Sequence, residues 1–447
     1  MIAILGAGLS GLSCSYHLGE GSCTIFEAKN YHGGHIASHE RDGFVWDEGP
    51  HVSFTKDPYV KTLLTKNLNG NFLEYEVNIG NYFKGSWIPH PTQSNLYAVP
   101  SPLRERCLED IIYARKNMGN SDKHENYQDW LKSAFGETFT NSFSAAYTRK
   151  YWTCEPSELT VDWIGERVAI PDLDTLLAGF NGPQPKKTNY ISSVRYPISG
   201  GFSKFADSFA KVSNIKYNHR VVEINLNNKS LTFENGECHK FEKLINTIPL
   251  PEFINLIVDV PEDILSAASN LYCSELLLVN VTATKKNSPN YHWFYVYDEE
   301  KYSTRVSFIE ELAKNNAPKG KTGVQVEVYS SQYRPQKVPD DTIVKSVIKE
   351  LIEMGIIACA ETVHTQRVKY ANVIFNHQTK PSMDLILRWL ANYGLNRGIG
   401  DLSPTTNWGS KTNEVIGDIS LAGRFGEWKY YWTDDCILRG KFLAENI

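Results

Sequence analysis

The chain has 447 residues, of which 41% are hydrophobic and 22% charged, so it is long enough for two or three globular domains. A formal net charge of -5 and a pI near 6.2 disfavour nucleic acid or an anionic membrane as partner, because proteins that bind those surfaces carry a basic face. The eight cysteines form no C-x-x-C pair and no apolar run approaches the roughly 18 residues of a membrane span, so we expect a cytoplasmic protein with reduced thiols and no metal site.

The first predicted elements are a strand at 2–5, a glycine turn and a helix. In a dinucleotide fold such a turn lets the backbone approach a pyrophosphate, which then lies at the positive end of the helix. A second predicted strand, CTIFEA, carries an acid near its end that is placed to accept hydrogen bonds from an adenosine ribose. The pattern predicts a nucleotide-binding domain whose contacts include Gly6, Gly8, Ser10, Gly11 and Glu27.

Three further regions follow in the chain. Residues 104–165 are rich in helix formers without strand alternation, which indicates a helical insertion. Residues 219–250 alternate around an Asn-Asn turn and close on an apolar strand, and residues 270–335 alternate as an antiparallel sheet does.

The continuation NYHGGHIAS, with Gly33 and Gly34, resembles the segment that flavoproteins of the amine-oxidase and glutathione-reductase type lay along the flavin side of their cofactor. This resemblance favours FAD over NAD. In those flavoproteins a segment like 219–250 returns to the nucleotide domain, and the residue matching Val222 contacts the adenine through its backbone. The nucleotide domain is therefore expected to be discontinuous.

Five segments in order resemble the flavin-dependent UDP-galactopyranose mutases. They are DGFVWDEGPHVSFT at 42–55, GSWIPHPTQSNL at 85–96, YTRKYWTCEPSELTVDWIGERV at 147–168, RYPISGGFSKF at 195–205 and AGRFGEWKYYWTDDCILRGK at 422–441. The resemblance implies catalytic roles for Arg167, Arg305 and His51, substrate contacts from Gln93, Asn95, Trp152 and Tyr430, and further cofactor contacts from Gly34, Val222, Gly423, Arg424 and Asp434. Arg167 and Arg305 would hold a diphosphate, for which guanidinium groups are suited.

The resemblance implies an α/β fold in which a Rossmann-like FAD-binding domain carries a helical insertion and an antiparallel substrate domain. The FAD-binding parts are expected at 1–85, 191–265 and 396–447, the mainly helical substrate-binding insertion at 86–190 and the antiparallel-sheet substrate domain at 266–395. It also implies a nucleotide-sugar mutase that interconverts pyranose and furanose forms in the synthesis of surface-polysaccharide precursors. In that reaction N5 of reduced FAD attacks the anomeric carbon and a flavin-sugar iminium follows, with NADH or NADPH as the candidate reductant.

Some positions depart from the family pattern. His90 and Thr92 stand where the family has Tyr and Phe, Thr433 occupies a methionine position of some bacterial relatives, and KYANVIFNHQTKPS at 369–382 replaces a stretch that supplies a phosphate-binding tyrosine, so that Tyr370 either fills that role or does not. The sugar, the base, the reductant and the oligomeric state, a homodimer included, stay open.

Alternatives also stay open for single residues and for the function. Trp152 and Tyr430 are equally candidates for the core, His51 for a buried structural histidine, and the two arginines for surface ion pairs. The alternative functions are an FAD-dependent amine oxidase or desaturase and a flavin-binding protein without catalysis. Two guanidinium groups argue against an amine or apolar substrate.

Overall fold

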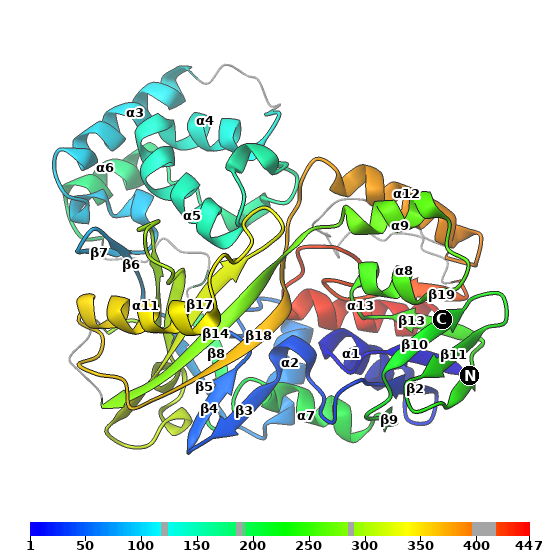
Figure 1. Cartoon of the computed structure of the whole chain (residues 1–447). Helices are drawn as coiled ribbons and strands as arrows, with labels where there is room; N and C mark the ends of the chain where they lie inside the picture. The colour runs from blue at the N-terminus through cyan, green and yellow to red at the C-terminus, as the bar shows by residue number, and fades with distance from the viewer. Residues whose placement is uncertain (118–123, 185–190, 192, 285–289, 396–416) are drawn as a thin grey trace.

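The computed structural model describes residues 1–117, 124–184, 191, 193–284, 290–395 and 417–447 (Figure 1). Its nucleotide-binding part is built on a five-stranded parallel sheet with the order β19 (Ile419–Leu421), β13 (Lys243–Asn246), β1 (Ile2–Leu5), β2 (Cys23–Phe26) and β9 (Ile215–Lys216). The predicted Rossmann-like fold is confirmed, and the strands of its sheet come from three separated segments of the chain. Helix α1 (Leu9–Leu18) packs against α7 (Lys204–Lys211) and α13 (Thr433–Asn446).

An antiparallel sheet lies beside this domain and consists of β10 (Val221–Asn225), β11 (Ser230–Phe233) and β12 (Cys238–Lys240). Phe233 stacks on Phe26 of β2, with 4.6 Å between the ring centroids. Helices α8 (Leu250–Leu256), α9 (Glu262–Ser269) and α12 (Thr379–Ala391) gather on the same side of the molecule in Figure 1. The alternation predicted for 219–250 thus forms these short strands together with β13.

The second large sheet has seven strands. Their order is β18 (Thr362–Val373), β14 (Cys273–Thr284), β17 (Lys321–Ser330), β16 (Arg305–Phe308), β15 (Trp293–Val296), β6 (Ile79–Phe83) and β7 (Ser86–Pro89). All neighbours are antiparallel except β15 and β6. Helix α11 (Asp340–Glu353) packs on the sheet through Ile343, Val347 and Leu351. The β6–β7 hairpin crosses the domain boundary expected at residue 85.

The helical insertion forms the separate lobe at the top of Figure 1. It contains α3 (Leu103–Asn117), α4 (Tyr127–Phe139), a π-helical turn (Thr140–Ser144), α5 (Ala145–Tyr151) and α6 (Leu173–Asn181). Helix α5 is tied to the loop between β15 and β16, because the buried ammonium group of Lys150 donates to the carbonyl oxygens of Asp298 and Ser303, both at 2.7 Å. Among the described helices, none is both long and apolar enough to cross a bilayer.

Two small antiparallel sheets hold the loop that enters the site. One pairs β3 (Ser38–Arg41) with β4 (Phe44–Asp47), and the other pairs β5 (Phe72–Glu76) with β8 (Ser193–Pro197). Helix α2 (Pro58–Asn67) lies between β4 and β5 in the chain, and α10 (Ile309–Leu312) follows β16. The Asp47 carboxylate accepts hydrogen bonds from Ser38 Oγ at 2.6 Å, Tyr196 Oη at 2.7 Å and the Phe202 N–H at 3.0 Å. These bonds join the end of β4 to β8 and to the turn that follows it, so the loop after Asp47 starts from a fixed point.

Candidate active site and cofactor cleft

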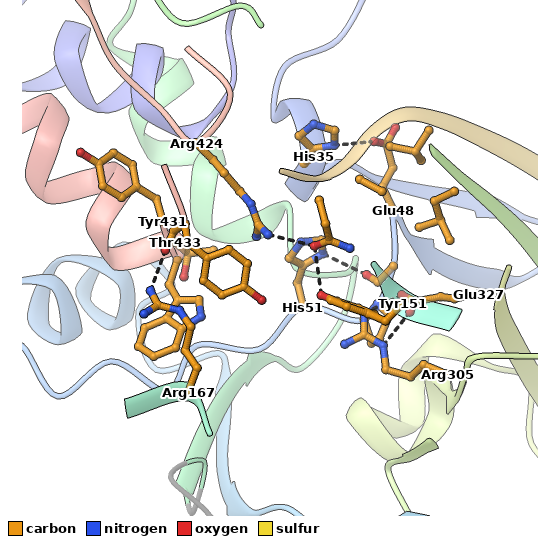
Figure 2. Close-up of a pocket in the computed structure, with 18 of the residues that line it drawn as sticks. His35, Glu48, His51, Tyr151, Arg167, Arg305, Glu327, Arg424, Tyr431 and Thr433 are labelled. Carbon is orange, nitrogen blue, oxygen red and sulfur yellow. Dashed lines mark hydrogen bonds and ion pairs between the residues drawn. The ribbon is translucent and has the colours of Figure 1, made fainter. Parts of the chain in front are cut away.

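A cavity of about 650 Å³ lies where the nucleotide-binding part, the seven-stranded sheet and the helical insertion meet. One stretch of its lining is the glycine turn before α1, and another is the group of aromatic side chains on α5, β15 and β17. Figure 2 shows Arg167, Arg305 and Arg424 reaching into it from different elements. The cavity thus joins the predicted nucleotide end to the predicted substrate end.

The glycine turn forms a cradle for a phosphate group. Gly6 has φ of 97°, and a Cβ on Gly11 would lie 2.1 Å from the Gly6 carbonyl oxygen, so only glycine lets α1 approach the turn this closely. Across the cleft Gly423 has φ of 85°, and a Cβ there would lie 3.0 Å from Ser10 Oγ. Gly6, Gly8, Ser10 and Gly423 line the cavity, whereas Gly11 acts through packing. Unpaired N–H groups at the start of α1 favour an anion at this place.

Glu27 and the pair Gly33–Gly34 extend the same cradle. The Glu27 carboxylate accepts from the Ala7 N–H at 2.7 Å and from the Lys29 N–H at 2.9 Å, which holds it at the cavity wall. Gly33 and Gly34 both have positive φ, and a Cβ on Gly34 would lie 3.0 Å from the Gly8 Cα. Side chains at these glycines would collide with the backbone of Ala37 and of Gly8, so the glycines let the two turns approach each other and form a cradle that fits an extended dinucleotide cofactor.

Two other predicted cofactor residues lie outside the cavity lining. Val222 is on β10 and is 45% exposed. Asp434 lies in the first turn of α13. Arg424, which follows Gly423, does line the cavity and stacks on the Tyr430 ring at 4.6 Å.

The loop after β4 brings His51 and Glu48 to the cavity. Nδ1 of His51 donates to the Gly49 carbonyl oxygen at 2.9 Å, since a carbonyl can only accept, and Nε2 is left as the acceptor nitrogen. Burial lowers the pKa of His51 to about 4, so the ring is neutral at pH 7. Glu48 lies close to Lys29 at 3.5 Å and to His35 at 3.8 Å, the latter contact being drawn in Figure 2.

Arg167 is held between two aromatic rings. Its guanidinium carbon lies 4.5 Å from the centroid of Tyr430 and 4.7 Å from that of Trp432, and Nη2 donates to the Tyr430 carbonyl oxygen at 2.7 Å. The turn Gly165–Arg167 places this side chain in the cavity wall. Nη1 also donates to the Trp163 carbonyl oxygen at 3.4 Å, and the contacts with the two rings restrict the plane of the guanidinium.

Arg305 has a different environment. It lies opposite Glu327 in the β16–β17 register, and the two form a bidentate pair with distances of 2.8 Å (Nε to Oε2) and 2.5 Å (Nη2 to Oε1). Glu327 is only 1% exposed and also accepts from Tyr329 Oη at 2.8 Å. One edge of the guanidinium and its charge are therefore already matched by a carboxylate. Sequence reasoning missed Glu327, although an acid within the apolar alternation GVQVEVYS was a usable signal.

Aromatic side chains supply most of the remaining wall. Trp152 and Tyr430 both line the cavity, and their rings also contact each other, at 5.6 Å between centroids. Each side chain therefore faces the cavity and also packs against its neighbour in the cavity wall. Burial raises the pKa of Tyr147, Tyr151 and Tyr329 well above the usual range, and their hydroxyl groups stay protonated. These tyrosines were not singled out from the sequence, because their positions become meaningful only when α5 and β17 face each other.

The segment around the cis His90–Pro91 bond contains residues that line the cavity and one residue that holds the loop in shape. His90 and Gln93 line the cavity, and Gln93 Nε2 donates to the Ala169 carbonyl oxygen at 2.9 Å. Asn95 lies outside the lining, where its Nδ2 donates to the Pro91 carbonyl oxygen at 2.9 Å and holds the turn. The structure thus brings Gln93 to the site, while Asn95 is placed to shape the loop.

Comparison with known proteins gives a consistent fold. The model of the flavin containing amine oxidoreductase family matches residues 9–393. A 4,4'-diapophytoene desaturase from Staphylococcus aureus (strain Newman) is 23% identical, over 78% of this chain and 80% of that protein. A crystal structure of reduced UDP-galactopyranose mutase superposes with a TM-score of 0.87 at 20% identity, over 99% of this chain and 94% of the other. A putative protoporphyrinogen oxidase from Exiguobacterium gives a TM-score of 0.70 at 14% identity, over 99% and 97%.

Proposed function

Because the chain belongs to the flavin containing amine oxidoreductase family, we propose that it carries FAD in this cleft and, with the flavin reduced, interconverts the pyranose and furanose forms of a nucleotide sugar. The likeness of the fold to UDP-galactopyranose mutase supports the proposal, and so do the five sequence segments that resemble that family. A role in making surface-polysaccharide precursors would follow from this activity.

The observation that carries the proposal is the guanidinium of Arg167, stacked between Tyr430 and Trp432 in a cavity walled by tyrosine hydroxyl groups. A planar, oriented guanidinium suits a diphosphate, and hydroxyl groups suit the oxygens of a sugar. A hydrocarbon substrate has no oxygen atoms to match the guanidinium and hydroxyl groups of this wall.

Each residue then has a defined task. Arg167 would hold the diphosphate in place while the bond to the sugar breaks and re-forms, and the Arg305–Glu327 pair would give one further fixed wall with little net charge. Neutral His51 would present its Nε2 acceptor to the reacting region. Tyr147, Tyr151 and Trp152 would exclude water. Reduced flavin, when bound, supplies a nucleophilic centre, and the reaction has no net redox change.

The test is to reduce the purified protein anaerobically with dithionite and incubate it with UDP-, dTDP- and GDP-hexoses. Pyranose and furanose forms are then separated by chromatography. We expect interconversion of one of these sugars that stops when the flavin is oxidised, and NADH or NADPH is tried in place of dithionite to identify the reductant. No interconversion in the whole panel would contradict the proposal.

The second candidate is an FAD-dependent amine oxidase or desaturase, which the sequence similarity to the diapophytoene desaturase favours. In that case the reduced flavin would be reoxidised in each turnover, and an amine or polyene substrate would be consumed in air. Continuous consumption of such a substrate, together with inactivity toward nucleotide sugars, would select this candidate.

A further inference from the structure

The segment 369–382, which departs from the pattern of the mutases, contributes Ala371 and Asn372 to the cavity wall from the end of β18. Tyr370 does not line the cavity and makes an edge-on contact with Phe425, at 5.5 Å between centroids. Asn372 lines the cavity and is 5% exposed. The polar group that this segment offers to a ligand is therefore an amide.

Asn372 joins the three parts of the molecule. Its Oδ1 accepts from Tyr151 Oη at 3.0 Å and from Arg424 Nη2 at 2.9 Å. Tyr151 comes from α5 of the helical insertion, Arg424 from the loop after β19, and Asn372 from β18 of the large sheet. Since a guanidinium can only donate, these bonds fix which amide atom is the oxygen.

The other end of the amide is a donor without an acceptor. Both lone-pair positions of Oδ1 are used, and Nδ2 carries two N–H groups that form no hydrogen bond with any residue in the described part of the chain. Because Asn372 lines the cavity, this donor can be satisfied there by water or by an oxygen atom of a ligand. The rigidity of the amide means that this donor is ready before a ligand arrives.

We infer that Asn372 is a substrate-binding residue whose Nδ2 donates to an oxygen atom of the nucleotide sugar, on either the sugar or the diphosphate. The inference rests on the proposed function, because it takes a nucleotide sugar as the ligand. The same donor selects against an apolar substrate, which has no acceptor to offer. In the mutases, the stretch that segment 369–382 replaces supplies a phosphate-binding tyrosine. In this chain the amide of Asn372 would take the place of that tyrosine.

The test uses two variants of the flavin-loaded protein. Asn372→Asp keeps the shape and the oxygen that Tyr151 and Arg424 need but removes the donor, and Asn372→Ala removes the whole amide. The matched control is Asn376→Asp, four residues along, where the amide bonds Tyr333, Gln378 and Thr379 outside the cavity. Affinities for UDP and for UDP-galactose are measured from the change in flavin absorbance, with thermal melting as the check of folding.

We expect both Asn372 variants to bind UDP-galactose at least fivefold more weakly than the wild type, and Asn376→Asp to bind it unchanged. Loss for UDP-galactose alone assigns the contact to a sugar oxygen, and equal loss for UDP assigns it to the diphosphate. Wild-type affinity for both probes in a folded Asn372→Ala or Asn372→Asp protein would overturn this inference only. Failure of the wild type to bind either probe, together with no interconversion in the whole panel of UDP-, dTDP- and GDP-hexoses, would overturn it together with the proposed function.

Discussion

Burial sets the protonation state of two histidines in the cavity wall. Removal from water is the main cause that lowers the pKa of His51 and of His90 to about 4. At neutral pH both rings are therefore uncharged, so each offers one donor and one acceptor nitrogen. In His51 the bond to Gly49 decides which nitrogen is which.

His51 should make the stability of the protein depend on pH. Its pKa is about 4 in the folded chain and about 6.5 in the unfolded chain, so between these values the unfolded chain binds more protons and stability rises with pH. In His51→Gln we expect this rise, on the order of 2 kcal/mol from pH 4 to 6.5, to disappear. Urea unfolding of the flavin-loaded protein at several pH values measures it, with the exposed residue in His377→Gln as control. An unchanged slope in His51→Gln would contradict the assignment.

Arg167 should determine nucleotide affinity at the level of a single side chain. We expect Arg167→Ala to weaken UDP binding at least tenfold, because a charge-assisted, stacked contact is lost, and Arg167→Lys to recover only part of it, because an ammonium cannot bind two oxygens side by side. Calorimetric titration with UDP measures the effect. Arg388→Ala, on the exposed face of α12, is the control. Affinity and turnover near the wild-type values in Arg167→Ala would refute the role.

At the scale of elements, close packing of α1 is what gives the nucleotide end its shape. Gly11 allows α1 to approach the Gly6 turn, and Gly440 allows α13 to approach α1, since a Cβ on Gly440 would lie 2.6 Å from the Cβ of Ser13. Both glycines act without lining the cavity. Helix α1 is therefore closely packed on two sides, against the Gly6 turn and against α13. This packing fixes the position of its first residues in the cofactor cradle.

Gly11→Ala should lower flavin content. The added methyl group would lie 2.1 Å from the Gly6 carbonyl oxygen, so α1 must move away from β1 and its N–H groups lose their alignment with a pyrophosphate. The ratio of flavin absorbance to protein absorbance after purification measures this, and we expect less than half of the wild-type value. Gly182→Ala is the control, because a Cβ there meets nothing within 4 Å. Full flavin content in Gly11→Ala would show that the turn tolerates the shift.

At the scale of the whole molecule, Lys150 attaches the helical insertion to the large sheet. Its ammonium group is buried and donates to two carbonyl oxygens of the β15–β16 loop. The cost of burying the charge lowers the pKa of Lys150 to about 7. Tyr151 and Trp152 line the cavity and follow Lys150 directly in the chain, so this contact holds the segment that carries them.

Lys150→Met should change how stability responds to alkaline pH. Between pH 7 and about 10.5 the unfolded chain binds the proton that the folded chain has lost, so the wild type gains stability relative to Lys150→Met as the pH rises, on the order of 1 kcal/mol per pH unit. Urea unfolding at pH 7, 8 and 9 measures this difference. Lys349→Met, which removes an exposed lysine, is the control. A difference that stays constant over this range would contradict the buried, neutralised lysine.

The sequence by itself determined the nucleotide-binding end, the helical insertion and the antiparallel sheet. These features depend on local signals: glycines at short spacing, an acid after a strand, and periods of two or about 3.6 residues. The positive φ value of Gly6 bears out the predicted glycine turn, because only nearby residues decide it. The order of the five family segments indicated the arrangement that the fold then showed.

Only the tertiary structure decided which partners the charged and polar groups of the cavity have. Arg305 meets Glu327 because two strands pair in one register, and Asn372 meets Tyr151 and Arg424 although 221 and 52 residues separate them in sequence. A change of one residue in the register of β16 or β17 would turn Arg305 or Glu327 to the other face of the sheet. Such pairings depend on how distant segments pack, and no local pattern encodes them.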